Sequence, residues 1–286
     1  MAILIDLSQI AIANACMVPK QKGMTLDVNL LKHMIINSIR GYHQRLKQEY
    51  GKTIICCDTS PYWRKDIFPH YKASRDLLKS GKDFIDWELV FKTIKELKAE
   101  LKEFFPYKIL SVQGCEADDI IAVLCKQLSP TEKVVIVGGD KDYKQLHKFK
   151  NVSQFSPKTK EFIRVDNPEK ELKSMIITGD KSDGIPNIRS ASNTFVTKGK
   201  RQTPIRQAEI DRWWKLAPQF FCESKAMLEN HQRNKDLIDF ECIPEKYSAN
   251  ILQAYEEFEI TGSKIKIMEY FRVNKMRNLM EHIGDF

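Results

Sequence analysis

Short apolar, β-branched runs alternate with helical patterns through the first half of the chain, and this alternation restricts the possible folds more than any other feature. The runs predict strands at residues 3–5, 53–57, 108–112 and 134–137. The helical patterns between them lie near residues 27–49, 86–104 and 116–128. Strands that are apolar throughout and are joined by helices are typical of a parallel sheet. We therefore predict an α/β fold with a mostly parallel central sheet and helices on both faces.

The strand pattern weakens after about residue 150, where a helical half begins. One extended pair, residues 152–155 with 162–165, predicts a hairpin at the edge of the sheet. Helical patterns follow near residues 169–178, 205–215, 223–231, 247–258 and 262–282, with a predicted loop at 193–204. We therefore divide the chain into an α/β core, residues 1–165, and a helical subdomain, residues 166–286.

Acidic residues directly follow three of the predicted strands. Asp6 follows the apolar run in ILIDLS, Asp58 ends IICCD, and Asp140 and Asp142 follow VVIVGG. A single Asp in such a place usually caps a helix or makes a turn. Three at once are harder to explain in this way, because a carboxylate beside an apolar strand is costly when it is buried without a partner. The carboxyl ends of parallel strands also form the ligand crevice of α/β proteins.

Two further acidic motifs bring the set to nine carboxylates. CEADDIIAVL places Glu116, Asp118 and Asp119 in the first turn of a predicted helix, and GDKSDGIP adds Asp180 and Asp183. A site with oxygen ligands and neither His nor Cys suits a hard divalent cation, for which Mg²⁺ is the default, and is a poor fit for zinc. We predict two Mg²⁺ ions, with Mn²⁺ as a substitute.

The charge balance indicates a polyanionic partner. The chain has 46 Lys and Arg residues against 38 Asp and Glu residues, a net charge of +8. Without the nine carboxylates the remaining residues carry 46 positive and 29 negative charges, a net charge of +17. Metal ions held in an acidic pocket, within a body that attracts phosphate, form the arrangement used in two-metal phosphodiester hydrolysis.

Residues 59–85 form a basic, aromatic insertion after Asp58. Aromatic rings stack on unpaired bases and cations contact phosphates, so we predict a nucleic-acid contact. Its candidate residues are Tyr62, Trp63, Arg64, Lys65, Tyr71, Lys72 and Arg75. Lys72 and Arg75, one helical turn apart, could face a scissile phosphate together. The alternative is a solvated loop whose aromatic rings pack onto the core.

The sequence predicts a cytoplasmic protein. The N-terminal stretch lacks a basic region and carries Asp6 within its apolar run, so we interpret it as a buried strand rather than a signal peptide. No apolar run approaches the roughly 20 residues that span a bilayer. The seven cysteines include no C-x-x-C pair, which favours a reducing compartment.

Six motifs occur in the order of the flap endonuclease, or 5′-nuclease, family, which the chain resembles over nearly its whole length. They are ILIDLS, IICCD, YWRKDIFPHYKASR, CEADDIIAVL, GGDKDYKQLH and GDKSDGIPNI. The resemblance implies a metal-dependent 5′-to-3′ exonuclease and flap endonuclease. As in phage members, it would remove RNA primers, an RNase H activity, and adjacent DNA during replication in the host cytoplasm. The implied partners are RNA–DNA hybrid, flapped or nicked duplex DNA, a sliding clamp and a single-strand DNA-binding protein.

The resemblance also implies residue roles. The family's first metal position matches Asp6, Asp58, Glu116, Asp118 and Asp140, with Asp142 close by. Its second position matches Asp119, Asp142, Asp180 and Asp183. The arch Lys and Arg match Lys72 and Arg75, which together with Asp118 are the predicted catalytic residues.

One motif departs from the family. A G-I-G-x-K-T-A turn in many members grips duplex backbone with amides and a monovalent cation, but here its second half is missing from GIPNIRSASNTF. Lys198, Lys200 and Arg201 are the candidate duplex contacts instead, with a solvated basic loop as the alternative. Two other functions stay open. A PIN-type single-strand ribonuclease would be shorter and less acidic, and a non-catalytic nucleic-acid-binding relative would have lost carboxylates.

Overall fold

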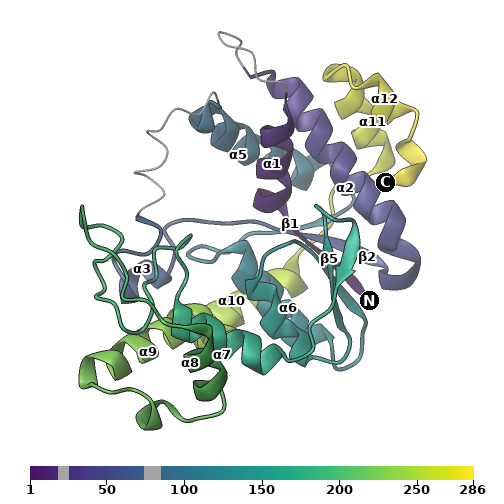
Figure 1. The fold of residues 1–286 in the computed structure, drawn as a ribbon. Coiled ribbons are helices and arrows are strands. Elements are labelled where there is room, and N and C mark those ends of the chain that lie inside the picture. The colour runs from purple at the N-terminus through teal and green to yellow at the C-terminus, as the bar shows by residue number, and fades with distance from the viewer. Residues whose placement is uncertain (19–25, 74–84) are drawn as a thin grey trace.

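A six-stranded sheet forms the centre of the computed structural model, which describes residues 1–18, 26–73 and 85–286 (Figure 1). The strand order is β3-β2-β1-β4-β5-β6; the first five strands are parallel, and β6 pairs antiparallel with β5. The bounds are β1 Ala2–Asp6, β2 Lys52–Cys56, β3 Lys108–Leu110, β4 Val134–Val137, β5 Val152–Ser156 and β6 Glu161–Ile163. The predicted parallel sheet and edge hairpin are confirmed.

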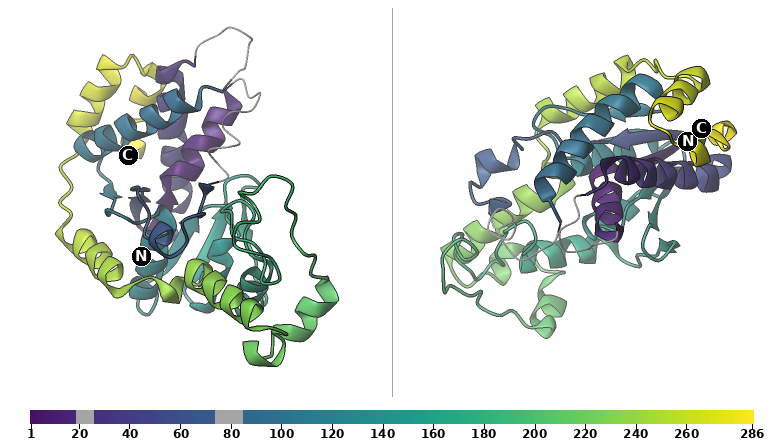
Figure 2. Two further views of the ribbon diagram at one scale, coloured as in Figure 1. Left: turned by 90° about the vertical axis from the view of Figure 1, so that its left-hand side faces the viewer. Right: turned by 90° about the horizontal axis from the view of Figure 1, so that it is seen from above.

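Helices cover both faces of the sheet, as predicted (Figures 1 and 2). Along β1, Ile3 and Ile5 face one cluster of buried side chains, and Ala2 and Leu4 face another. The first cluster includes residues of α1 Leu7–Met17, α2 Val28–Tyr50, α5 Trp87–Phe104, α11 Lys264–Val273 and α12 Arg277–Met280. The second includes residues of α6 Ala117–Leu128 and α10 Glu245–Glu257.

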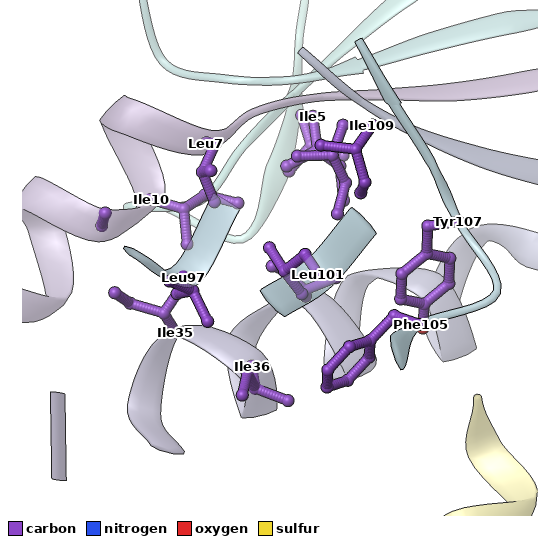
Figure 3. Close-up of a cluster of buried hydrophobic side chains, with 14 of the residues drawn as sticks. Ile5, Leu7, Ile10, Ile35, Ile36, Leu97, Leu101, Phe105, Tyr107 and Ile109 are labelled. Carbon is purple, nitrogen blue, oxygen red and sulfur yellow. The ribbon is translucent and has the colours of Figure 1, made fainter. Parts of the chain in front are cut away.

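The first cluster fixes the sheet against its helices (Figure 3). Ile5 and Ile109 from two strands meet Ile35 of α2 and Leu97 and Leu101 of α5, all of them almost fully buried. Burying one such aliphatic side chain contributes about 1.5–3 kcal/mol. The loops at the carboxyl ends of the strands therefore start from a rigid base.

Helix α1 was not predicted from the sequence. It begins directly after β1, with Asp6 as its N-cap accepting a hydrogen bond from the Gln9 amide at 2.9 Å. The helix buries Ile10, Ala11 and Ala15, whose helical spacing is hidden in a nearly continuous apolar run. Interpreting the whole N-terminal stretch as strand was therefore wrong beyond Asp6.

The C-terminal half contains the predicted helices, but not as one packing unit. α7 Pro168–Thr178, α8 Gln207–Trp213 and α9 Lys225–Ile238 supply two separate buried clusters. By contrast, Ile251 of α10 and Phe271 of α11 are buried within the two clusters of the sheet. Residues 245–286 thus pack with the α/β core. The division of the chain into two domains at residue 165 stays a prediction.

The remaining elements are short. They are α3 Arg64–Ile67 and the 3-10 helices η1 Asp142–Lys148, η2 Pro218–Phe220, η3 Phe240–Cys242 and η4 Ile283–Asp285. Residues 193–204 contain neither helix nor strand, as predicted. No helix in the described ranges combines the length and the apolar character needed to cross a lipid bilayer.

Candidate metal centre

The first carboxylate group, defined as Asp6, Asp58, Glu116, Asp118 and Asp140, gathers at the carboxyl ends of three neighbouring strands and the start of α6. β1 lies between β2 and β4, so the residues that follow these strands share one edge of the sheet. The strand order also reverses between β1 and β4, the position where α/β sheets bind ligands. The amide of Ala117 donates to Asp58 at 2.9 Å, which ties α6 to the end of β2.

Burial and repulsion between carboxylates raise the pKa values of two members of this group, Asp6 and Asp118. The pKa of Asp6 is raised to about 7, first by burial and then by the charge of Asp58. Burial also raises the pKa of Asp118 well above its usual range, with further contributions from Asp6 and Asp140. Carboxylates held so close together gain more from a cation than separate ones do.

The second carboxylate group consists of Asp142, Asp180 and Asp183. One carboxylate oxygen from each lies within 4.8 Å of the others. Burial and the charges of Asp140 and Asp180 raise the pKa of Asp142 to about 8. Burial also opposes ionisation of Asp180, but hydrogen bonds from Ser182 and the ion pair with Lys141 at 3.0 Å outweigh it and lower that pKa.

A tight turn after α7 places two members of the second carboxylate group. Asp180 and Ile185 exchange two backbone hydrogen bonds of 2.8 and 2.7 Å, which close the turn. Gly179 enters it with a φ of +67°, and a Cβ there would lie 2.3 Å from the carbonyl oxygen of Ile185. Only glycine fits this position without a shift of backbone.

Asp119 does not join the second carboxylate group, contrary to the role that the resemblance implied. Its side chain is fully buried, accepting a hydrogen bond from the Trp63 indole at 3.1 Å and lying 2.8 Å from the Arg64 guanidinium. It also accepts the Glu116 amide at 2.9 Å as part of a capping box. Successive residues of a helix point about 100° apart, so Asp118 and Asp119 face different surroundings.

The first part of the insertion packs into the protein instead of offering exposed faces. Trp63, Arg64 and Tyr71 are each 3% exposed, so the expectation that they are open to bases and phosphates is wrong in this structure. The Tyr71 hydroxyl lies 2.7 Å from Glu116 and 2.9 Å from Asp183. The alternative, that the aromatic rings pack onto the core, describes these residues correctly.

Arg64 has a structural position that the sequence did not predict. Its guanidinium bridges Glu116 at 3.0 Å and Asp119 at 2.8 Å, and it donates to the Leu237 carbonyl at 2.8 Å. Removing one partner of such a buried pair costs about 3–5 kcal/mol. Arg64 therefore holds the Glu116 and Asp119 carboxylates together and links them to α9.

Lys72 lies between the two carboxylate groups. Its backbone adopts a φ of +57°, and its amide donates to the Asp183 carbonyl at 2.8 Å. Its ammonium contacts the Glu116 carboxylate and lies 3.7 Å from Asp183. One cationic side chain thus touches both groups.

The other predicted nucleic-acid contacts lie nearer the surface. Tyr62 is half-buried, and Lys65, Lys198, Lys200 and Arg201 are exposed. Arg75 lies outside the described residues. In the turn that departs from the family motif, the Pro186 carbonyl accepts hydrogen bonds of 2.9 Å from Arg233 and from Asn234. Protein donors therefore occupy a carbonyl of this turn.

Tyr143 is a site residue that sequence reasoning missed. Its ring is fully buried, and its hydroxyl lies 3.1 Å from Asp6 and contacts Asp118. The available signal was its position directly after the acidic pair in DKDY, where a phenol can reach the neighbouring carboxylates.

These features define a class. The structure has two adjoining groups of carboxylates at the edge of a parallel sheet, in a chain of net charge +8. This arrangement is typical of a metal-dependent phosphodiesterase. The donor set fits hard divalent cations because all ligands are oxygens. Comparison with known proteins identifies the family within that class.

Two family descriptions match the sequence: 5′-3′ exonuclease, N-terminal resolvase-like domain, over residues 3–175, and T4 RNase H, C terminal, over residues 166–286. Ribonuclease H of Enterobacteria phage T4 is 32% identical over 297 residues, covering 99% of this chain and 95% of that protein. A 5′-3′ exonuclease of Buchnera aphidicola (subsp. Schizaphis graminum) is 34% identical, covering 48% of each chain. The chain therefore belongs to the 5′-3′ exonuclease family and is a nuclease.

The fold agrees with that of a phage enzyme. A bacteriophage T5 flap endonuclease, solved as a pseudo-enzyme-product complex with DNA and metal ions, superposes with a TM-score of 0.64. The match covers 90% of this chain and 99% of that one, at 18% identity. A T5 5′-exonuclease with bound zinc gives a TM-score of 0.62, also at 18% identity, over 89% and 99%. The resolvase-like α/β fold with its helical C-terminal part is thus shared.

The stabilisation of the folded protein by a divalent cation is expected to increase with pH. The raised pKa values of Asp6 and Asp142 mean that the folded protein binds protons which the unfolded chain has released. Their favourable contribution is therefore complete below about pH 4 and is lost as the pH rises through about 7 and about 8. A divalent cation offsets the resulting repulsion once the carboxylates ionise.

Thermal unfolding with and without Mg²⁺ checks this expectation. The midpoint should rise more on metal addition at about pH 8.5 than at about pH 6. NaCl at equal ionic strength is the control for screening. An equal Mg²⁺ effect at both pH values would contradict the role of these carboxylates as metal ligands.

Proposed function

We propose that the protein is a two-metal 5′-to-3′ exonuclease and flap endonuclease that removes RNA primers, and adjacent DNA, during phage replication in the host cell cytoplasm. Its substrates are RNA–DNA hybrids and flapped or nicked duplex DNA. The arrangement of two carboxylate groups with Lys72 between them carries the proposal. The similarity to the phage T4 ribonuclease H over 99% of the chain supports the choice of substrate.

The first carboxylate group would hold one Mg²⁺ and the second would hold another, with Mn²⁺ as a substitute. When bound, two such ions activate a water molecule as nucleophile and stabilise charge on the attacking and leaving oxygens. Asp118 and Asp183 are the members whose replacement separates the two positions, because they belong to different groups. Asp119 and Arg64 hold Glu116, a member of the first group, in place.

Lys72 would neutralise the scissile phosphate. Its side chain is 14% exposed, and its ammonium contacts carboxylates of both groups, so a phosphate that bridges the groups would meet it. A fixed cation at the position where charge develops lowers the barrier without reorganisation. Arg75 is assigned the same phosphate, from its place in the sequence alone.

Surface cations would hold the rest of the substrate. Lys65 and the loop residues Lys198, Lys200 and Arg201 are exposed, as contacts to duplex phosphates require. Tyr62, half-buried, is the remaining candidate for base stacking. A sliding clamp and a single-strand DNA-binding protein are proposed partners on the family resemblance alone.

Cleavage of 5′-labelled substrates tests the function. With Mg²⁺ the enzyme should shorten an RNA–DNA hybrid from its 5′ end and cut a DNA flap, and EDTA should abolish both reactions. A labelled single-stranded RNA of the same sequence serves as the control. Cleavage of that RNA alone would favour the PIN-type alternative. Binding without any cleavage would favour a non-catalytic relative, although all nine carboxylates are present.

A further inference from the structure

Tyr143 joins two carboxylates that come from different parts of the fold. Asp6 ends β1 and Asp118 lies in the first turn of α6. The Tyr143 hydroxyl lies 3.1 Å from Asp6 Oδ2 and also makes a hydrogen bond with Asp118 Oδ1. Within the described ranges, Tyr143 is the only protein donor to the Asp118 carboxylate. Asp6, by contrast, also accepts the Gln9 amide.

The ring of Tyr143 is held in place by its packing. It is fully buried among the side chains that surround α6, beneath the end of β4. A Cβ at Gly138 would lie only 2.8 Å from Cε2 of the ring, so the backbone there packs directly against it. The hydroxyl therefore cannot move away from the two carboxylates without a shift of its surroundings.

Tyr71 offers an instructive contrast. Its hydroxyl also lies between two carboxylates, those of Glu116 and Asp183. Glu116, however, has two cationic partners as well, Arg64 and Lys72. Loss of the Tyr71 hydroxyl leaves Glu116 supported, whereas loss of the Tyr143 hydroxyl leaves Asp118 without its hydrogen-bond donor.

We propose that Tyr143 is a positioning residue that holds the carboxylates of Asp6 and Asp118 ready for a divalent cation, and thereby sets the affinity of the first carboxylate group for that ion. Two carboxylates that face one pocket repel each other and turn apart without a cation. A phenol has one proton, which it donates to one carboxylate at a time. Because the Tyr143 oxygen is fixed within hydrogen-bonding distance of both carboxylates, either of them can accept that proton. The inference deepens the proposed function, because it rests on metal binding at the first carboxylate group.

Replacing Tyr143 with Phe removes the hydroxyl and keeps the ring. Hydrogen-bonding partners behind metal ligands typically contribute about 10–100-fold to affinity. We expect Tyr143→Phe to weaken Mn²⁺ binding at the first carboxylate group by about tenfold and at the second by less than about twofold. Isothermal titration calorimetry of the metal-free protein measures both, with Asp118→Asn and Asp183→Asn assigning the two binding phases.

Tyr107→Phe is the matched control. The Tyr107 hydroxyl is buried too, and no described residue hydrogen-bonds to it. Its removal should leave both Mn²⁺ affinities unchanged. The midpoint of thermal unfolding in EDTA, measured for both variants, reports whether the fold is kept.

A double-mutant cycle identifies the residue through which Tyr143 acts. In an Asp118→Asn background the added Tyr143→Phe change should alter Mn²⁺ binding by less than about twofold, because the carboxylate that it positions is already lost. An unchanged first affinity in Tyr143→Phe, an equal loss in both phases, or loss of the fold would each overturn the proposal. Absence of metal binding by the wild-type protein would instead overturn the proposed function.

Discussion

Asp118→Asn is expected to lower turnover by roughly a thousandfold, equivalent to about 4 kcal/mol of the activation barrier. The amide keeps the shape of the side chain but removes a charge from the first carboxylate group, where burial and the charges of Asp6 and Asp140 show that several carboxylates converge. Binding of nucleic acid should stay within about twofold, since phosphate contacts elsewhere supply most of the affinity.

Single-turnover rates on the RNA–DNA hybrid, beside equilibrium binding without metal, measure the two effects. Asp166→Asn makes the same chemical change at an exposed position and serves as the control. Asp183→Asn should reduce the rate less, or shift the Mg²⁺ requirement upward, because water replaces a lost ligand more readily in the second carboxylate group. If Asp118→Asn retained more than about a tenth of the activity, the residue would have no place at the catalytic metal.

The sheet and its acidic edge were predictable because both depend on local patterns. Strands buried on two faces are apolar throughout, and a charged residue at the end of such a run marks the point where the strand leaves the core. Asp6, Asp58 and Asp140 stand at those points. The parallel arrangement then brings them to one edge, without any knowledge of side-chain contacts.

The burial of Arg64 was not predictable in the same way. Its partners, Glu116 and Asp119, lie 52 and 55 residues further along the chain. A basic, aromatic segment has the composition of a nucleic-acid contact whether its side chains face outward or inward. Only the tertiary structure brings Arg64 and Trp63 into contact with the buried Asp119 carboxylate.

The pair Asp118 and Asp119 illustrates the same limit at closer range. Motif and composition treat adjacent carboxylates as equivalent, and the family resemblance assigns both to metal. The structure separates them: Asp119 closes a capping box and pairs with Arg64, while Asp118 meets Tyr143. Neighbouring helix residues point in different directions, so the placement of α6 on the sheet decides which of the two carboxylates meets Tyr143 and which meets Arg64.

Lys72→Ala is expected to lower the single-turnover rate by about a hundredfold, the typical effect of removing one group that stabilises transition-state charge. The side chain contacts both carboxylate groups, so its ammonium lies where a phosphate held between two metal ions would be. Affinity for duplex should change by less than about threefold, since one cation among many contributes little to binding.

Lys198→Ala gives the opposite expectation. Lys198 is exposed on the loop after the turn, so its loss should weaken duplex binding and flatten the dependence of log K on log salt by about one unit of slope. Lys65→Ala, at an exposed position seven residues before Lys72, should weaken binding without changing the single-turnover rate, and it therefore controls for the loss of a lysine within the same segment. The measurements are a salt titration of binding and single-turnover rates at saturating Mg²⁺ for all three variants. If Lys72→Ala changed only affinity and Lys198→Ala changed only the rate, the assignment of Lys72 to chemistry and of the loop to the duplex would be wrong.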